Sequence, residues 1–417
     1  MEHIVDFIRT IKSQDNAPCC AYIYDLDQLR RHAIQTIQNL PSSCQLFYAI
    51  KANSEARILQ ELSPIMQGFE VASGGEIEKV RAADSDAPIL FGGPGKTDEE
   101  IASAIHYRVK LLHVESLHEL RRVNHIAAQM QVTVPILLRV NLRGSLPSAT
   151  LHMAGVPTQF GIAEEDIPKA ITLAQQCPHV DLHGFHFHSI SNNLDAYQHV
   201  QLIRHYITSA RDWAKAFAVN LRHVNVGGGI GINYANLESQ FDWPIFTSQL
   251  DALIRELRPG FTLLFECGRY LSAACGYYAA EVLDVKFTHG KWFAVIRGGN
   301  HHFRLPGAWQ HNHPFQVVPV DEWRFPFPRP EVCGNAMTIA GELCSPKDLL
   351  ARDVPVERVR AGDILLFPYA GAYGWHISHH DFLSHPHPQM HYLSQAVATG
   401  VLDNELDAGD MDIQKRA

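Results

Sequence analysis

The sequence predicts an α/β protein, a closed (β/α)8 TIM-like barrel followed by a C-terminal all-β domain. Over roughly the first 270 residues, eight short apolar runs alternate with segments that carry helix-start signals. This alternation is typical of parallel strands joined by helices, and eight strands in about 240 residues fit a closed barrel. Beyond about residue 270, the apolar runs are broken by Gly and Pro turns, a pattern that indicates a domain built from strands.

The eight expected barrel strands are apolar runs of five to eight residues. They are residues 45–51, 67–72, 87–91, 110–115, 134–140, 181–188, 222–227 and 262–266. Three of the segments between them fit the capping box, in which a Ser or Thr precedes a Glu by three residues. These segments are 73–76, 97–100 and 116–119, and each predicts the start of a helix.

The two ends of the chain differ from the barrel. Residues 1–16 have an amphipathic helical pattern with charges throughout, which is not a signal peptide. The strand-like run 19–25 is expected to join the β domain. We therefore expect a barrel domain over 26–268 and a β domain formed by 1–25 and 269–402. The polar, acidic residues 403–417 are expected to be disordered.

Composition excludes several classes of function. The chain has 417 residues, a formal net charge of -9 and no run rich in Lys or Arg, which argues against a nucleic-acid partner. No apolar stretch is long enough to cross a bilayer, so we expect a cytoplasmic protein with no membrane partner. Eight cysteines are present without a CxxC pair. In a cytoplasmic chain we expect them to be free thiols.

Polar residues and glycines lie near the ends of five expected strands. Lys51, Arg139, His188 and Glu266 lie at or near four strand ends, and the glycine run 227–229 follows the seventh strand. Catalytic residues of a barrel lie at the carboxyl ends of its strands. A lone strand-end lysine is usually a solvated surface group. Five such features on one rim predict an active site instead.

Seven strings support a family resemblance: FYAIKANSEARIL, FEVASGGE, FHFHSIS, VNVGGGIG, FECGRY, GELCSPKD and AGAYG. They resemble, in the same order, motifs of the fold-type III decarboxylases, which depend on pyridoxal 5'-phosphate (PLP). That family includes ornithine, arginine and diaminopimelate decarboxylases. The resemblance runs from about residue 20 to about residue 395. It implies a barrel fold, a PLP cofactor and a decarboxylase activity.

The resemblance implies a role for each matching residue. Lys51 would carry the cofactor as a Schiff base, Glu266 would pair with the pyridine nitrogen, and His188 would stack on the ring. A carboxylate beside the nitrogen keeps the ring able to accept electrons when CO2 departs. The further cofactor-binding residues implied are Glu70 and Arg139, which fix the lysine and the ring, and Ser191, Gly228, Gly229, Gly268, Arg269 and Tyr373 at the phosphate.

Cys344 and Asp348 match the family's Cys-x-x-x-Asp element. In the family this cysteine reaches the active site of the other subunit and protonates the product carbanion. The resemblance therefore implies a homodimer with two shared active sites, in which Cys344 is catalytic. A buried core cysteine is the alternative.

One departure from the family pattern concerns the substrate. Family members that act on free diamino acids carry an acid directly after this cysteine, whereas this chain has Ser345. A distal ammonium would lose its partner, and an unpaired buried charge costs ~3–5 kcal/mol. Arg304 matches the carboxylate-binding arginine of diaminopimelate decarboxylases. The expected substrate contacts are Arg304, His302, Ser345, Tyr373 and His380. The histidine spacings match no zinc pattern, so no metal is expected.

Longer strings, among them FGGPGKTDEE and AGAYGWHISHHDFLSHPHP, resemble the siderophore-biosynthesis subgroup that includes the staphyloferrin B decarboxylase. The resemblance implies decarboxylation of a citrate–amino acid conjugate, most simply citryl-L-2,3-diaminopropionate to citryl-ethylenediamine. The alternative is a decarboxylase of a free diamino acid such as diaminopimelate. A racemase would pair the pyridine nitrogen with Arg rather than Glu266, and a regulatory homologue without cofactor would not keep Lys51.

Overall fold

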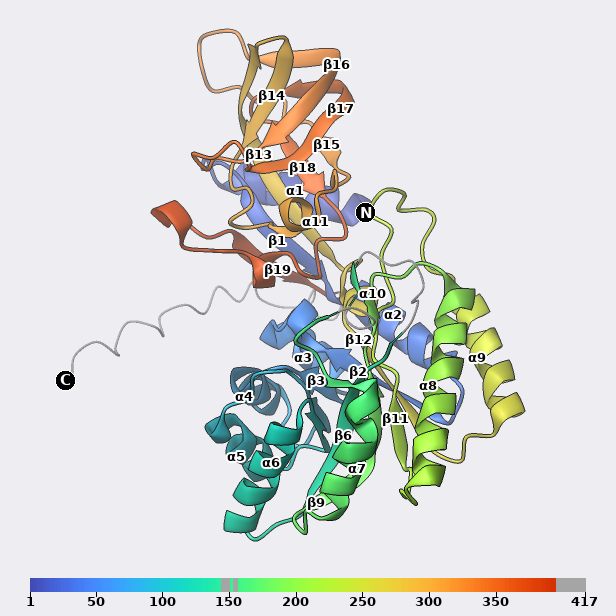
Figure 1. The fold of residues 1–417 in the computed structure, drawn as a ribbon. Coiled ribbons are helices and arrows are strands. Elements are labelled where there is room, and N and C mark those ends of the chain that lie inside the picture. Colours follow the sequence, from blue (N-terminus) through green and yellow to red (C-terminus); the bar gives the residue numbers. More distant parts are fainter. Residues whose placement is uncertain (144–150, 153–156, 395–417) are drawn as a thin grey trace, which may run out of the picture.

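The computed structural model describes residues 1–143, 151–152 and 157–394. Two bodies follow each other along the chain, a helix-covered barrel and a β-sheet domain (Figure 1). The expected tail 403–417 lies outside the described residues. No helix among the described residues is long and apolar enough to cross a membrane.

The barrel contains all eight strands that the sequence predicts. They are β2 (Cys44–Ala49), β3 (Phe69–Val71), β4 (Ile89–Phe91), β5 (Leu111–Val114), β6 (Val134–Asn141), β9 (Val180–Phe187), β11 (His223–Asn225) and β12 (Thr262–Cys267). The strand order is β5-β4-β3-β2-β12-β11-β9-β6, and the pairing of β5 with β6 closes the ring. Each of these neighbouring pairs is parallel. The fold prediction of a closed eight-stranded barrel is confirmed.

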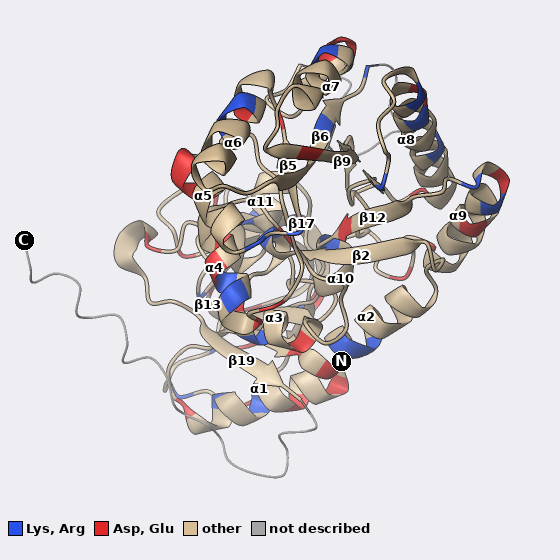
Figure 2. Cartoon of the chain, turned by 90° about the horizontal axis from the view of Figure 1, so that it is seen from below, with Lys and Arg blue, Asp and Glu red and all other residues tan. Residues whose placement is uncertain are grey.

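Helices cover the outside of the barrel (Figure 1). They are α2 (Leu26–Gln38), α3 (Ala56–Leu62), α4 (Gly74–Ala83), α5 (Asp98–His106), α6 (Leu117–Gln129), α7 (Ile167–Gln175), α8 (Ala196–Ala216) and α9 (Trp243–Leu257). In Figure 2 basic and acidic segments are interspersed over these helices.

The three predicted caps begin α4, α5 and α6. In each, the Ser or Thr side chain accepts a backbone N–H three residues on. Only Thr97 forms the complete capping box, in which the Glu100 carboxylate also accepts from the backbone of Thr97. Glu76 and Glu119 instead accept from the residue before their caps, at Ala72 and Glu115.

The second sheet contains β1 (Cys20–Asp25), β13 (Gly276–Thr288), β14 (Lys291–Ile296), β15 (Gln316–Val318), β16 (Glu331–Ala340), β17 (Leu349–Arg360), β18 (Ile364–Phe367) and β19 (Gln389–Leu393). Most pairs are antiparallel, but β14 pairs with β16, and β1 with β19, in parallel. Helix α1 (Glu2–Gln14) buries Ile4 and Ile8 against β1 and β18. The sheet is thus mixed, and it carries the short helix α11 (Leu305–Trp309) as well as strands.

Candidate active site

Lys51 and Glu70 face each other at the mouth of the barrel. Lys51 lies in a single 3-10 turn, residues Ile50–Ala52, directly after β2. Its Nζ lies 2.9 and 3.1 Å from the two carboxylate oxygens of Glu70 on β3. Burial opposes the positive charge, but Glu70, with Tyr373 and Glu266, holds the pKa of Lys51 above its ordinary value. The pair gives a half-exposed amine with a fixed position beside a buried carboxylate.

Glu266 and His188 lie on the same side of the strand order as this pair, at the ends of β12 and β9. Glu266 is on β12, which pairs directly with β2, and its side chain is 2 % exposed. His188 follows the end of β9, and its Nδ1 lies 3.9 Å from Glu266 Oε2. Burial, and then the charges of Lys51 and Arg139, hold the pKa of His188 well below its ordinary value. His188 is therefore a neutral imidazole beside a carboxylate.

The glycine run 227–229 follows β11 and lies so close to neighbouring backbone that side chains there would clash. We call this run the glycine cradle. A Cβ at Gly228 would lie 2.0 Å from the backbone oxygen of Glu266, and one at Gly229 would lie 2.6 Å from that of Ile190. Gly227 and Gly229 also have φ of +70° and +85°, in the left-handed region that favours glycine. Backbone N–H groups can therefore approach an anion closely at this point.

Arg269 stands beside the cradle inside an aromatic cage. It follows Gly268, and its Nη1 donates to the hydroxyl of Tyr234 at 3.0 Å. Its guanidinium lies 3.7 Å from the ring centroid of Trp309 and 4.4 Å from that of Tyr373. Tyr373 adopts φ of +54°, and its backbone N–H donates to the oxygen of Ala52, one residue after Lys51.

Arg139 and Ser191, two of the expected cofactor residues, are held by different parts of the barrel. Arg139 on β6 donates to Glu115 Oε1 at 2.7 Å and lies over the ring of Phe160. The other carboxylate oxygen of Glu115 accepts from the backbone of Gly161. Ser191 lies in the two-residue strand β10 (Ile190–Ser191), next to the residue that faces the Gly229 cradle. The structure thus brings all the predicted cofactor residues to one end of the barrel.

Cys344 and Ser345 lie in the loop between β16 and β17. Cys344 is exposed and free. Asp348 is buried, and its carboxylate accepts backbone N–H bonds from Asn300 and Leu343. The loop is therefore held in shape by Asp348 while its cysteine faces outward.

The remaining expected substrate residues gather near Trp375, two residues beyond Tyr373. Arg304 is exposed, its backbone N–H donates to Ser378 Oγ, and its guanidinium forms no ion pair with any described residue. His380 stacks on Trp375 at 3.5 Å. His302 is fully buried, with Nδ1 at 3.4 Å from Cys20 Sγ and Nε2 without a partner among the described residues.

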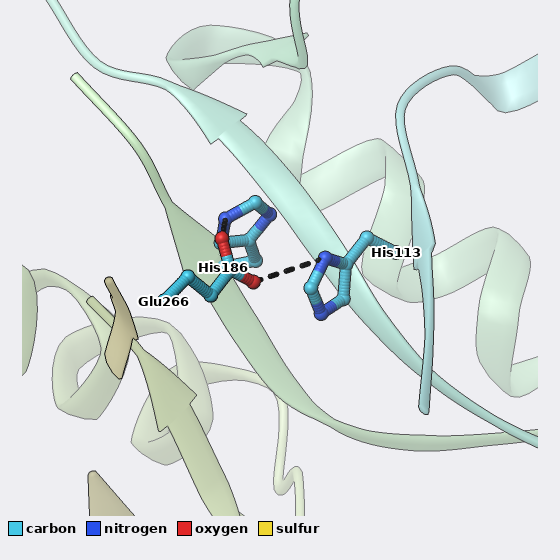
Figure 3. Close-up of side chains that lie close together, drawn as sticks. All are labelled: His113, His186 and Glu266. Atoms are coloured by element: carbon cyan, nitrogen blue, oxygen red, sulfur yellow. Dashed lines mark ion pairs between the residues drawn. The ribbon is translucent and has the colours of Figure 1, made fainter. Parts of the chain in front are cut away.

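Three residues near Glu266 escaped the sequence analysis. Asn225 donates to Glu266 Oε1 at 2.6 Å, and His113 and His186 lie 3.6 and 3.4 Å from its two oxygens. Figure 3 shows both imidazoles directed at the carboxylate. His186 precedes His188 by two residues on a strand, so period-two alternation offered a signal. No local pattern marked His113, because it reaches Glu266 across the barrel interior.

The residues present fit a PLP group. Lys51 offers an amine for the cofactor aldehyde, and Glu266 offers a buried carboxylate for the pyridine nitrogen. The neutral imidazole of His188 suits the cofactor ring, and the glycine cradle with the buried Arg269 suits the phosphate. Fold and site together define the class, a barrel-fold enzyme that binds PLP.

The chain belongs to the pyridoxal-dependent decarboxylases. The family model "Pyridoxal-dependent decarboxylase, pyridoxal binding domain" matches residues 26–273. The chain is 50 % identical over 396 residues to the Staphylococcus aureus "2-[(L-alanin-3-ylcarbamoyl)methyl]-2-hydroxybutanedioate decarboxylase", with 95 % of this chain and 99 % of that protein covered. It is also 31 % identical to a diaminopimelate decarboxylase of Bacteroides thetaiotaomicron, with 85 % and 90 % covered. The chain is thus a PLP-dependent decarboxylase that acts on a small molecule.

Solved structures show the same fold. Diaminopimelate decarboxylase from Helicobacter pylori in complex with L-lysine superposes with a TM-score of 0.81 at 24 % identity, covering 92 % of this chain and 94 % of that one. The arginine decarboxylase of Paramecium bursaria Chlorella virus gives a TM-score of 0.79 at 18 % identity, covering 93 % and 100 %. Both the barrel and the second sheet are therefore shared.

We expect Gly228→Ala to destroy the cradle. Its Cβ would meet a backbone oxygen that cannot move without shifting β12, and overpacking of this kind costs about 1–3 kcal/mol or more. Cofactor affinity and the melting temperature should both fall. Gly75→Ala is the matched control, since a Cβ there meets nothing within 4 Å. Normal cofactor binding by Gly228→Ala would contradict the assignment.

Proposed function

We propose that this enzyme decarboxylates the amide of citrate with L-2,3-diaminopropionate and releases citryl-ethylenediamine. The observation that carries the proposal is the relative that is 50 % identical over nearly the whole of both chains. Its name describes a citrate carboxyl group joined to the side-chain amine of 2,3-diaminopropionate, which leaves the α-amine and α-carboxylate free. Such a product would serve carboxylate siderophore biosynthesis.

Two of the expected substrate residues support this substrate class over a free diamine. Ser345 is neutral where a distal ammonium would need an acid, and Arg304 is an exposed cation without a carboxylate partner among the described residues. A guanidinium binds carboxylates in a two-pronged geometry. His302, His380 and Tyr373 complete the proposed contacts to the citryl end.

The proposed mechanism assigns a task to each residue at the mouth. Lys51 would hold the cofactor through its aldehyde, and Glu266 would pair with the pyridine nitrogen. Neutral His188 would lie against the ring without adding charge. The phosphate would be bound by Gly228, Gly229, Gly268, Ser191, Arg269 and Tyr373. The bound cofactor supplies an acceptor for the electron pair left on Cα when the bond to the carboxylate breaks and CO2 leaves.

The last chemical step needs a proton at Cα, and we assign it to Cys344 of a second subunit. Cys344 is exposed in the loop between β16 and β17, so a second subunit could cover it. A homodimer with two shared sites would bring it to the partner's barrel mouth. We propose a barrel domain over 26–268 and a β domain over 1–25 and 269–402 that forms this contact. Location in the cytoplasm stays a prediction from the sequence.

Release of CO2 from citryl-diaminopropionate, compared with diaminopimelate, ornithine and lysine, tests the substrate. We expect the citryl amide to have the highest kcat/KM. Preference for a free diamino acid would replace this proposal with the diaminopimelate-type alternative.

Ser345→Glu should lower kcat/KM for the citryl amide by about tenfold or more, because a carboxylate would face the substrate's carboxylates in a desolvated pocket. Ser345→Gln is the matched control, since it adds similar bulk without charge. Steady-state CO2 release measures both. Equal losses for the two variants would show that bulk, and not charge, matters at this position.

A further inference from the structure

Two histidines lie in the barrel interior against the carboxylate of Glu266 (Figure 3). His113 Nδ1, on β5, is 3.6 Å from Oε1, and His186 Nε2, on β9, is 3.4 Å from Oε2. All three side chains are at most 3 % exposed. These nitrogens have no hydrogen-bond partner within normal range among the described residues. Buried polar atoms without partners are rare and call for a functional explanation.

Asn225 determines which nitrogen of His113 carries the proton. The backbone N–H of Gly227 donates to Asn225 Oδ1 at 2.8 Å, which identifies the amide oxygen and leaves Nδ2 as a donor. That Nδ2 donates to Glu266 Oε1 at 2.6 Å and lies 3.4 Å from His113 Nε2. His113 Nε2 must then accept, so the proton of a neutral ring lies on Nδ1, the atom that faces Glu266.

Both rings are neutral. Burial holds the pKa of His113 and of His186 well below the ordinary value. Arg139 and Lys96 lower both, Lys51 also lowers that of His186, and Glu266 opposes the shift at His113. The three donor atoms also lie within 4.8 Å of one another, close enough for a metal ion. A metal ion there would, however, occupy the carboxylate of Glu266 that the proposed function assigns to the pyridine nitrogen.

We propose that His113 and His186 are positioning residues for Glu266. Each neutral imidazole directs an N–H at one carboxylate oxygen, and with Asn225 the two rings fix the orientation of the carboxylate. The carboxylate then meets a protonated pyridine nitrogen without reorganising. This inference rests on the role of Glu266 in the proposed function.

The coupling to Glu266 is tested by cofactor affinity. His113→Phe and His186→Phe should each weaken PLP binding by about tenfold, because each removes a polar N–H that faces the buried carboxylate of Glu266. His186→Gln, which keeps a donor, should stay within about threefold. In a Glu266→Gln background neither Phe variant should have a further effect, because the histidines act through that carboxylate. His183→Phe, on the same strand β9 but paired with Asp181, is the matched control.

A second measurement uses the wild-type protein, so it does not depend on how well a variant folds. Nitrogen-15 histidine spectra of the full-length holoenzyme should contain one ring protonated only at Nδ1 that does not titrate between about pH 5 and 9, and the His113 variant assigns it. Protonation of the His113 ring at Nε2 would overturn the inference. So would a further loss of PLP affinity when a Phe substitution is added to Glu266→Gln, or one bound metal ion per chain that His113→Phe removes. If Glu266→Gln alone leaves PLP binding unchanged, the role of Glu266 itself is wrong.

Discussion

Lys51→Ala is expected to abolish turnover, with kcat/KM falling by roughly 10³-fold or more, the scale on which loss of a covalent catalytic group acts. The visible absorption of the lysine-bound cofactor should disappear as well. Borohydride reduction should add the mass of the cofactor to the wild-type chain, at Lys51, and add none to the variant. These outcomes follow because no other described lysine lies at the barrel mouth against Glu70.

The control must separate chemistry from folding. Removal of Lys51 leaves the buried carboxylate of Glu70 without its counter-charge, and burial already raises the pKa of Glu70. Glu70 should therefore take up a proton in the variant, which limits the loss of stability. Lys79→Ala is the matched variant, because Lys79 is an exposed lysine on α4 that contacts only Ser54 Oγ. A Lys51→Ala protein that keeps its colour and turnover would contradict the assignment.

The sequence was sufficient to predict the elements whose signals are local. All eight barrel strands were predicted, because each is a short apolar run bounded by polar residues, and strand ends located Lys51, His188 and Glu266. The caps of α4, α5 and α6 were predicted as Ser or Thr side chains. The carboxylates of Glu76 and Glu119 do not complete their capping boxes, because other donors bind them. The backbone N–H of Ala72 donates to Glu76, and the ammonium of Lys96 donates to Glu119.

The remainder depends on contacts between distant segments. The parallel pairing of β14 with β16 and of β1 with β19 joins residues whose order along the chain gives no cue. His113 contacts Glu266 because β5 and β12 face each other across the barrel, separated by β4, β3 and β2 in the sheet. The register of five strands must be correct before that contact can be predicted. The strands of a parallel barrel are buried on both faces, so their sequences contain little alternation that would set this register.

Cys344→Ala is expected to lower kcat by about 10²-fold, the lower range for loss of a positioned proton donor, while cofactor absorption stays normal. In the proposed dimer, Cys344, which is exposed within one chain, would act in the active site of the partner subunit. Cys333→Ala is the matched control, because Cys333 is also exposed but lies within β16 rather than in the loop that Asp348 holds.

Mixing two inactive variants distinguishes a shared site from a site within one chain. When Lys51→Ala and Cys344→Ala chains exchange subunits at random, half of the dimers contain one chain of each kind. Each mixed dimer then has one site with both residues intact, so activity should recover to about a quarter of wild type. Recovery requires that Lys51 and Cys344 of one site come from different chains. In a mixed dimer, one site then carries both substitutions and the other site carries neither. No recovery after verified subunit exchange would place both residues in one chain's site and would contradict the shared active site.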